Sequence, residues 1–269
     1  MKRFLLSTIL ACSFTLPALA DDALNSAIAG AHRSTDNSAR DSARHPYETL
    51  SFFGIKPTMT VVELSPGGGW YTEILAPYLR DKGTLIAALG DPESSSEYAR
   101  KGAAKFRQKL DATPAVFSKV QVGVFEPGNK YNFAAAGSVD LVVTFRNIHN
   151  WAPSGDAQVL AAFKAAYDAL KPGGVFGVVD HRLPESKATN HKSGYLHESY
   201  VIGLAKKAGF TLAEKSEINA NPKDTADHKS GVWALPPVLA NKDEDREKYV
   251  AIGESDRMTL KFVKPAVKK

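Results

Sequence analysis

Cysteine and long apolar runs are the two features that this sequence most clearly lacks. It contains a single cysteine, Cys12, and no apolar run beyond residue 20 approaches the length of a membrane span. Crossing a bilayer takes about 20 apolar residues, so we expect no transmembrane segment in the body of the chain. The seven histidines show no close ligand spacing such as H-E-x-x-H, and we therefore expect no metal site.

The first 20 residues have the pattern of a secretory signal peptide. Lys2 and Arg3 precede an apolar stretch at 4–19, and Ala18-Leu19-Ala20 forms a small-x-small cleavage site. We predict cleavage after Ala20 and a periplasmic or secreted mature protein. The alternative is an N-terminal hydrophobic helix that belongs to the fold. Cleavage would remove the only cysteine, which excludes disulfide and thiolate chemistry, and would lower the formal charge from +5 to +3.

The remaining positive charge is spread along the chain. The pairs Lys206-Lys207 and Lys268-Lys269 are short and lack interleaved aromatic residues, so we interpret them as solvated faces and expect no nucleic-acid partner. Hydrophobic residues make up 43% and charged residues 23% of the chain, which is typical of a globular protein. A length of 269 residues accommodates one large α/β domain with appendages.

Strand and helix patterns alternate from Thr60 to Gly209, which predicts a mainly parallel sheet covered on both faces. We therefore predict one α/β domain over residues 55–269, and a helical cap before it at 21–54. Residues 219–254 hold three prolines and dense charge, which indicates a long irregular insertion before the last strand. The seven predicted strands are residues 60–64, 84–89, 115–125, 139–145, 175–179, 210–218 and 258–263.

The cap region carries closely spaced charges. Arg33, Asp36, Arg40, Asp41 and Arg44 follow one another at steps that suit helical ion pairs, which we expect on an exposed face. A proline at position 46 and a glycine at position 54 should begin and end a second helix. The cap either closes a ligand site or serves only as a solubilising leader.

A glycine turn lies near the start of the predicted sheet. In Val61–Thr72, an apolar strand ends in Glu63 and Leu64, and Ser-Pro-Gly-Gly-Gly leads into a helix. Glycine lets the backbone approach a ligand, and the free N–H groups of the first helical turn face it. The dinucleotide pattern G-x-G-x-x-G would need glycine in place of Thr72, which disfavours a nicotinamide or flavin cofactor.

Polar side chains follow two later strands. Arg146, Asn147 and His149 come after the fourth strand, and His181 and Arg182 come after the fifth. Both loops should line the crevice at the carboxyl ends of the strands. Either histidine is a candidate general base, because its pKa lies near working pH, although each alone could be a hydrogen-bonded loop residue. Imidazoles and guanidiniums together suggest an anionic or oxygen-bearing substrate, with His149, His181 and Arg146 as the catalytic candidates.

Four segments together resemble the class I S-adenosylmethionine-dependent methyltransferases. Val61–Gly69 is similar to the glycine-rich first motif of that family, and residues 140–143 resemble its fourth-strand motif. Residues 169–175 are similar to the turn that enters the fifth strand. Asp91, which lies 24 residues after Gly67, stands where an acidic residue binds the ribose hydroxyls. The resemblance covers roughly residues 55–265.

The resemblance implies a Rossmann-like, doubly wound, seven-stranded mixed sheet and S-adenosyl-L-methionine as cofactor. It implies that Glu63 helps to bind the amino-acid end of the cofactor and that Phe125 and Glu126 face the adenine. The alternatives are that Glu63 only braces the turn and that Asp91 only shapes the turn before Pro92. The candidate cofactor-binding residues are Glu63, Ser65, Gly67, Gly69, Asp91, Phe125, Glu126 and Asn147.

Three further segments, residues 65–72, 145–151 and 260–265, resemble a bacterial subgroup of predicted methyltransferases with signal peptides. The chain departs from the family at Ser65, where glycine usually stands, and at Pro66, which removes a donor N–H. Ser65 should either take a less favoured backbone angle or change the loop. We predict an exported methyltransferase that acts on a small molecule. The alternative is a non-catalytic protein that binds S-adenosylmethionine or a nucleotide-like ligand.

Overall fold

The structure, a computed structural model, describes residues 21–266. The predicted signal peptide lies outside this range and stays a prediction. Within the described range, no helix combines the length and the apolar character that crossing a membrane requires.

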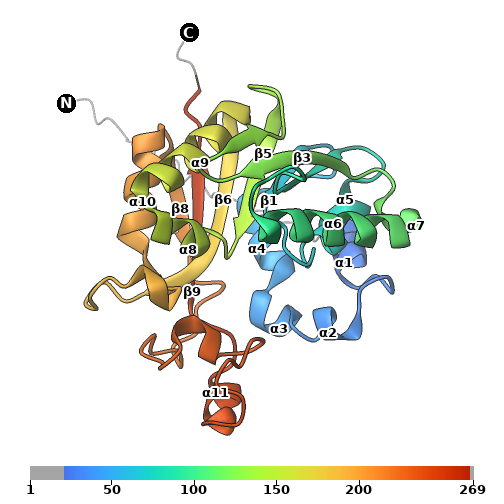
Figure 1. The fold of residues 1–269 in the computed structure, drawn as a ribbon. Helices are drawn as coiled ribbons and strands as arrows, with labels where there is room; N and C mark the ends of the chain where they lie inside the picture. The colour runs from blue at the N-terminus through green and yellow to red at the C-terminus, as the bar shows by residue number, and fades with distance from the viewer. Residues whose placement is uncertain (1–20, 267–269) are drawn as a thin grey trace, which may run out of the picture.

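A mixed β-sheet runs through the middle of the molecule (Figure 1). Its strand order is β4-β3-β2-β1-β5-β6-β9-β8, and β7 pairs with β6 beside this path. Strands β3, β2, β1, β5 and β6 run parallel, whereas β4, β9 and β8 are antiparallel to the strand that each one joins. The strands are β1 (Thr60–Leu64), β2 (Thr84–Leu89), β3 (Gln121–Glu126), β4 (Lys130–Asn132), β5 (Val139–Phe145), β6 (Leu170–Leu183), β7 (Leu196–His197), β8 (Thr211–Ser216) and β9 (Arg257–Val263).

The sheet has nine strands where the sequence predicted seven. Each predicted strand overlaps an observed one. The two additional strands, β4 and β7, have three and two residues, and segments this short show no periodicity. The third strand also begins later than predicted, because Pro114 starts a short helix instead.

Helices cover both faces of the sheet. Side chains along a strand alternate between faces, so Val62 and Leu64 belong to a core cluster that includes residues of α8, α9 and α10, while Val61 belongs to a second cluster with residues of α1, α4, α5, α6 and α7. The helices are α1 (Asp22–Ile28), α2 (Thr35–Ser38), α3 (Asp41–Arg44), α4 (Pro46–Phe53), α5 (Thr72–Leu79), α6 (Glu97–Ala112), α7 (Pro114–Phe117), α8 (Ile148–Trp151), α9 (Asp156–Ala169), α10 (Glu198–Ala208) and α11 (Arg246–Ile252), with 3-10 turns η1 (Ala152–Ser154), η2 (His191–Ser193) and η3 (Gly231–Ala234).

Two segments far apart in the sequence lie at the same end of the molecule. The short helices α2 and α3 of the N-terminal region and the segment around α11 both lie below the sheet in Figure 1. Arg40 binds Glu254 across this junction at 2.6 Å. The N-terminal region is helical as expected, with Pro46 opening α4 and Gly54 ending it at a φ of 78°. The N-terminal helical region and the segment that precedes β9 therefore contact each other at this end of the sheet.

Candidate functional site

The glycine turn joins β1 to α5 and has a left-handed backbone at three positions. Ser65, Gly67 and Gly69 have φ angles of 49°, 59° and 77°. Ser65 thus takes the less favoured angle, which costs a non-glycine residue about 1–2 kcal/mol. A Cβ atom built on Gly67 would have no neighbour within 4 Å, so the turn presents an open backbone surface at Gly67.

A cavity of about 580 Å³ opens in front of this turn, a size that suits a small molecule. Its walls come from the carboxyl ends of β1, β2, β3 and β5 and from α6. Five of the predicted cofactor-binding residues line it, namely Ser65, Gly67, Phe125, Glu126 and Asn147. We call this space the turn cavity.

Asp91 lies next to the turn cavity but does not line it. Its carboxylate accepts hydrogen bonds from Lys130 Nζ at 2.6 Å and from the Glu93 N–H at 3.0 Å, and the bond from Lys130 lowers its pKa. Glu126 accepts from Ser94 Oγ at 2.5 Å and from the Asp91 N–H at 3.3 Å. Asp91 therefore holds the loop after β2 in shape, while Glu126 also reaches the cavity.

Glu63 lies beneath the turn and is almost completely buried. It accepts a hydrogen bond from Thr72 Oγ1, the first residue of α5, at 2.6 Å. Burial raises its pKa to about 7, because an apolar environment disfavours the charged carboxylate. This contact braces the turn against the helix that follows it.

Asn147 joins the turn to the end of β5. Its Nδ2 donates to the carbonyl oxygens of Leu64 and Ser65, at 3.0 and 3.2 Å, and lies 3.1 Å from Thr144 Oγ1. The preceding residue, Arg146, is also left-handed, with a φ of 59°. The polar stretch that the sequence presented as a loop continues into the short helix α8. Asn147 thus ties the strained ends of two neighbouring strands together.

A second cavity, of about 390 Å³, meets the turn cavity along Ser65–Gly67 and Asn147. It has walls from α2 and α3, from the ends of β5 and β6, and from the segment between β8 and β9. The three predicted catalytic residues, Arg146, His149 and His181, all line it. We call this space the charged cavity.

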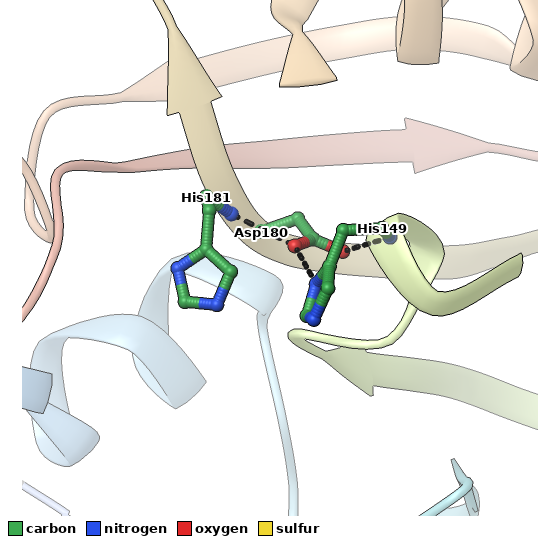
Figure 2. A group of neighbouring side chains, drawn as sticks. All are labelled: His149, Asp180 and His181. Carbon is green, nitrogen blue, oxygen red and sulfur yellow. Dashed lines mark hydrogen bonds and ion pairs between the residues drawn. The ribbon is translucent and has the colours of Figure 1, made fainter. Parts of the chain in front are cut away.

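His149 forms a hydrogen-bonded pair with Asp180 (Figure 2). Its Nδ1 lies 2.8 Å from Asp180 Oδ1, and the same carboxylate accepts the backbone N–H groups of Ile148 at 2.7 Å and His181 at 2.8 Å. Asp180 is completely buried. Since Nδ1 is engaged, Nε2 is the nitrogen of His149 that remains open, and it bonds no described residue. Asp180 was missed from the sequence, although it directly precedes His181 at the end of a predicted strand.

His181 stands beside this pair, with its ring centroid 4.7 Å from that of His149. Its Nδ1 lies 2.5 Å from Ser255 Oγ. Burial, together with the charges of His149 and of nearby arginines, holds its pKa well below 6.5. His181 is therefore a neutral imidazole at physiological pH. Arg182, by contrast, turns away to Asp256 and Glu217 and does not line the cavity.

One nitrogen or oxygen atom from each of His149, Asp180 and His181 fits within a 4.8 Å spread, which is a geometry that could hold a metal ion. Long sequence separation hid this grouping from a search for ligand motifs. The arginine charges that lower the pKa of His181 oppose a cation in the same way, and Asp180 already accepts several N–H groups. The grouping suits proton transfer better than metal binding.

Four guanidinium groups surround the carboxylate of Glu254. This differs from the exposed ion pairs that the sequence predicted, because Arg44 is only 1% exposed and its acidic partner lies 210 residues away. Ion pairs at such separations leave no local pattern. Glu254 is contacted by Arg40 at 2.6 Å, Arg257 at 3.2 Å, Arg44 at 3.3 Å and Arg146 at 3.9 Å.

This fold is shared with solved structures of S-adenosylmethionine-dependent methyltransferases. One from Aquifex aeolicus aligns with a TM-score of 0.56 at 15% identity, covering 84% of this chain and 93% of that one. The [4+2]-cyclase SpnF aligns with a TM-score of 0.58 at 13% identity, covering 93% of each chain. A protein of Galdieria sulphuraria, provisionally described as a sarcosine dimethylglycine methyltransferase, gives 0.55 at 12% identity over 86% and 88%.

No family model matches the chain, and no curated protein sequence matches it. At these identities the structural likeness shows the fold alone. A cyclase stands among the similar structures, so this fold carries more than one chemistry. The function of this chain therefore depends on the residues that line the turn cavity and the charged cavity.

Proposed function

We propose that the protein is an exported S-adenosylmethionine-dependent methyltransferase that acts on a small, anionic or oxygen-bearing molecule. The observation that carries the proposal is the junction of the two cavities at Ser65–Gly67, with the buried His149–Asp180 pair on the far side of that junction. The shared fold supports the cofactor class. The N-terminal sequence pattern supports export.

The residues of the turn cavity fit this cofactor. Gly67 leaves open space where any other residue would place a Cβ atom, and a ligand could approach the backbone there. Phe125 offers an apolar surface and Glu126 an acceptor for an exocyclic amino group. When bound, the cofactor would supply an electrophilic methyl group. Asn147, which holds the turn in place, would keep the distance between the two bound molecules constant.

His149 is the proposed general base. Asp180 selects the tautomer in which Nε2 carries the free lone pair, orients the ring and stabilises the imidazolium that forms when His149 takes a proton. A hydroxyl group facing Nε2 would lose its proton to His149 as its oxygen attacks. Neutral His181 would offer a hydrogen bond without adding charge. Alignment of the two molecules by the cavity walls would supply much of the rate.

We further propose that residues 21–54 close the acceptor site. Asn37, Arg40 and Arg44 of this region line the charged cavity, and Trp70 Nε1 donates to the Asn37 carbonyl at 2.9 Å. These contacts support the cap interpretation over that of a solubilising leader.

Calorimetry with S-adenosylmethionine and its demethylated product tests the cofactor assignment. The wild-type protein should bind both, and Gly67→Val should abolish binding, since its side chain would extend into the turn cavity. Gly137→Val is the matched control, because Gly137 has a similar φ of 63° and an equally open environment but lies outside both cavities. Failure of the wild-type protein to bind either compound at millimolar concentration would overturn the proposal.

Catalysis is then tested separately from binding. A His149→Gln variant should keep its affinity for the cofactor and lose methyl transfer to acceptors that carry a hydroxyl proton. If wild-type protein binds the cofactor but transfers no methyl group to any hydroxyl, amine or carbon acceptor tried, the non-catalytic binding role is the better description.

A further inference from the structure

Arg44 is a buried cation whose hydrogen-bonding capacity is largely unused. Its side chain is 1% exposed, and neither Nη1 nor Nη2 has a hydrogen-bond partner in the described chain. Its Nε reaches Glu254 at 3.3 Å, and its Cζ lies 4.6 Å from the Trp70 ring centroid. Buried donors are nearly always paired in folded proteins. Arg44 borders the charged cavity, so a bound group can supply the missing acceptors.

The charges around Arg44 are also unbalanced. Among residues 21–266, Glu254 is the one carboxylate that contacts Arg40, Arg44, Arg146 and Arg257 within 4.0 Å. Their positive charge holds the pKa of Glu254 down at about 2, so it is ionised and still leaves three positive charges in excess. Arg40 Nη2 is a further buried donor without a partner in this part of the chain. The cluster therefore has more positive than negative charge, and it also has more buried hydrogen-bond donors than acceptors.

The arginine cluster and the proposed base are neighbours. Glu254 contacts the arginines, and the next residue, Ser255, contacts His181 Nδ1 at 2.5 Å. Adjacent Cα atoms are about 3.8 Å apart, so one short segment contacts both the arginine cluster and His181, and Arg44, His149 and His181 all line the charged cavity. Trp70 and Trp233 add flat apolar surfaces to the same cavity.

We propose that Arg44, with Arg40 and Arg146, binds an oxyanion of the methyl acceptor, and that the acceptor is a small hydroxylated carboxylic acid or phosphate ester. This inference rests on the proposed function for the transfer step. The anionic group would pair with the free Nη donors of Arg44, because a guanidinium matches carboxylate and phosphate in two-point geometry. A hydroxyl elsewhere on the acceptor would then face His149 Nε2.

The proposed transfer moves a methyl group from sulfur to the acceptor oxygen and a proton from that oxygen to His149. The acceptor oxygen forms a bond to the methyl carbon as the bond from that carbon to sulfur breaks. The bonding electrons remain on sulfur, which becomes a neutral thioether. The hydroxyl proton moves to His149 Nε2, and the oxyanion held by Arg44 takes no part in the bond changes.

Anion binding can be measured without any turnover. We would titrate the purified protein with inorganic phosphate, with 4-hydroxybenzoate and with uncharged 4-hydroxybenzamide by calorimetry. Wild-type protein should bind the two anions and not the amide, and Arg44→Gln should lose about tenfold or more in anion affinity, as expected for a charged hydrogen bond. Equal anion affinity in wild type and Arg44→Gln would overturn the proposal.

Arg33→Met is the matched control for Arg44→Gln. Arg33 packs on the same Trp70 ring at 4.9 Å, but Asp41 pairs with it at 2.6 and 2.7 Å and it does not line the charged cavity. Its replacement should leave anion affinity unchanged. Loss of anion affinity in Arg33→Met equal to that in Arg44→Gln would show that general disturbance of the cap, and not the free guanidinium, is responsible.

The carboxylate of the cofactor is the competing source of an anion. S-adenosylhomocysteine carries that carboxylate and methylthioadenosine does not, so both are titrated into wild type and Arg44→Gln. We expect the variant to bind both as wild type does. Selective loss of S-adenosylhomocysteine affinity would assign Arg44 to the cofactor and overturn the acceptor assignment. If the protein binds the anions but neither S-adenosylhomocysteine nor methylthioadenosine, the proposed function is refuted and the anion site is retained.

Discussion

The two cavities differ in how the chain builds them and in how well their polar groups are satisfied. The turn cavity is formed by residues 65–158, mostly with backbone, apolar and uncharged side chains. The charged cavity draws its walls from residues 37–255 and contains the buried Arg44, two partly buried arginines and two buried histidines. On the proposed function, the turn cavity needs shape and a close backbone for a nucleoside, and one short motif can supply both. The charged cavity needs buried charge for an anionic acceptor, and that charge comes from distant segments.

Two buried charged groups in or next to the charged cavity differ in their pairing: Asp180, behind His149, is fully paired, and Arg44, in the wall, is not. Asp180 accepts N–H groups from three residues, whereas the Nη atoms of Arg44 have no partner within residues 21–266. A group that stabilises the fold should have partners for its polar atoms, as Asp180 has. A group that binds a ligand should have polar atoms without partners in the free protein, as Arg44 has. Unfolding experiments on the free protein separate these cases.

The largest effect is expected from Asp180→Ala. Removing this carboxylate leaves the Ile148 and His181 N–H groups without an acceptor, and breaking a buried charged network costs about 3–5 kcal/mol. Urea unfolding should show a loss of that size. Asp180→Asn, which keeps an acceptor oxygen, should lose clearly less. Equal stability of wild type and Asp180→Ala would remove the contrast with Arg44.

Glu63→Gln should change the pH dependence of stability. The pKa of Glu63 is about 7 in the folded protein and 4.5 in the unfolded chain. The protonated carboxyl therefore contributes its full stabilisation below pH 4.5, and this contribution is lost as the pH rises from 4.5 through 7. Over that window the loss amounts to about 3 kcal/mol, and the glutamine variant should not show it. Urea unfolding at pH 4 and pH 8 measures both proteins. The same change in stability between pH 4 and pH 8 in both proteins would contradict a raised pKa for Glu63.

Ser65→Gly should stabilise the turn. Ser65 has a φ of 49°, and glycine removes a left-handed strain of about 1–2 kcal/mol, partly offset by its greater freedom in the unfolded chain. We expect a net gain of about 0.5 kcal/mol, visible as a higher urea midpoint. Ser138→Gly is a suitable control, because Ser138 is not among the residues with positive φ. A similar gain there would indicate an unrelated cause.

Arg44→Met should have only a small effect on stability, far below that of Asp180→Ala. Glu254 keeps three other arginines when Arg44 is removed, and replacing an imperfectly paired buried ion with an apolar side chain is often neutral or favourable. We expect a change within about 1 kcal/mol, of either sign. A loss comparable to that of Asp180→Ala would place Arg44 among the residues that stabilise the fold.

The sequence predicted the sheet and the turn better than the charged cavity, for a physical reason. Periodicity and glycine spacing are local, so the main strands and the left-handed turn could be read from short windows. The hydrogen bond between His149 and Asp180 spans 31 residues and the pair between Arg44 and Glu254 spans 210. Arg40 and Arg44 had suitable acidic neighbours in the cap, and only the packed structure shows that they contact Glu254 instead.

Asn147 borders both cavities while it holds the turn between them. On the proposed function, a molecule that strengthens the contact of Asn147 with the turn from one cavity would change the free energy of binding in the other cavity. Such coupling is reciprocal: the factor by which a cofactor raises the affinity for an acceptor equals the factor by which the acceptor raises the affinity for the cofactor. An acceptor that has not been identified can therefore be recognised by the change it causes in cofactor affinity, before any product is found.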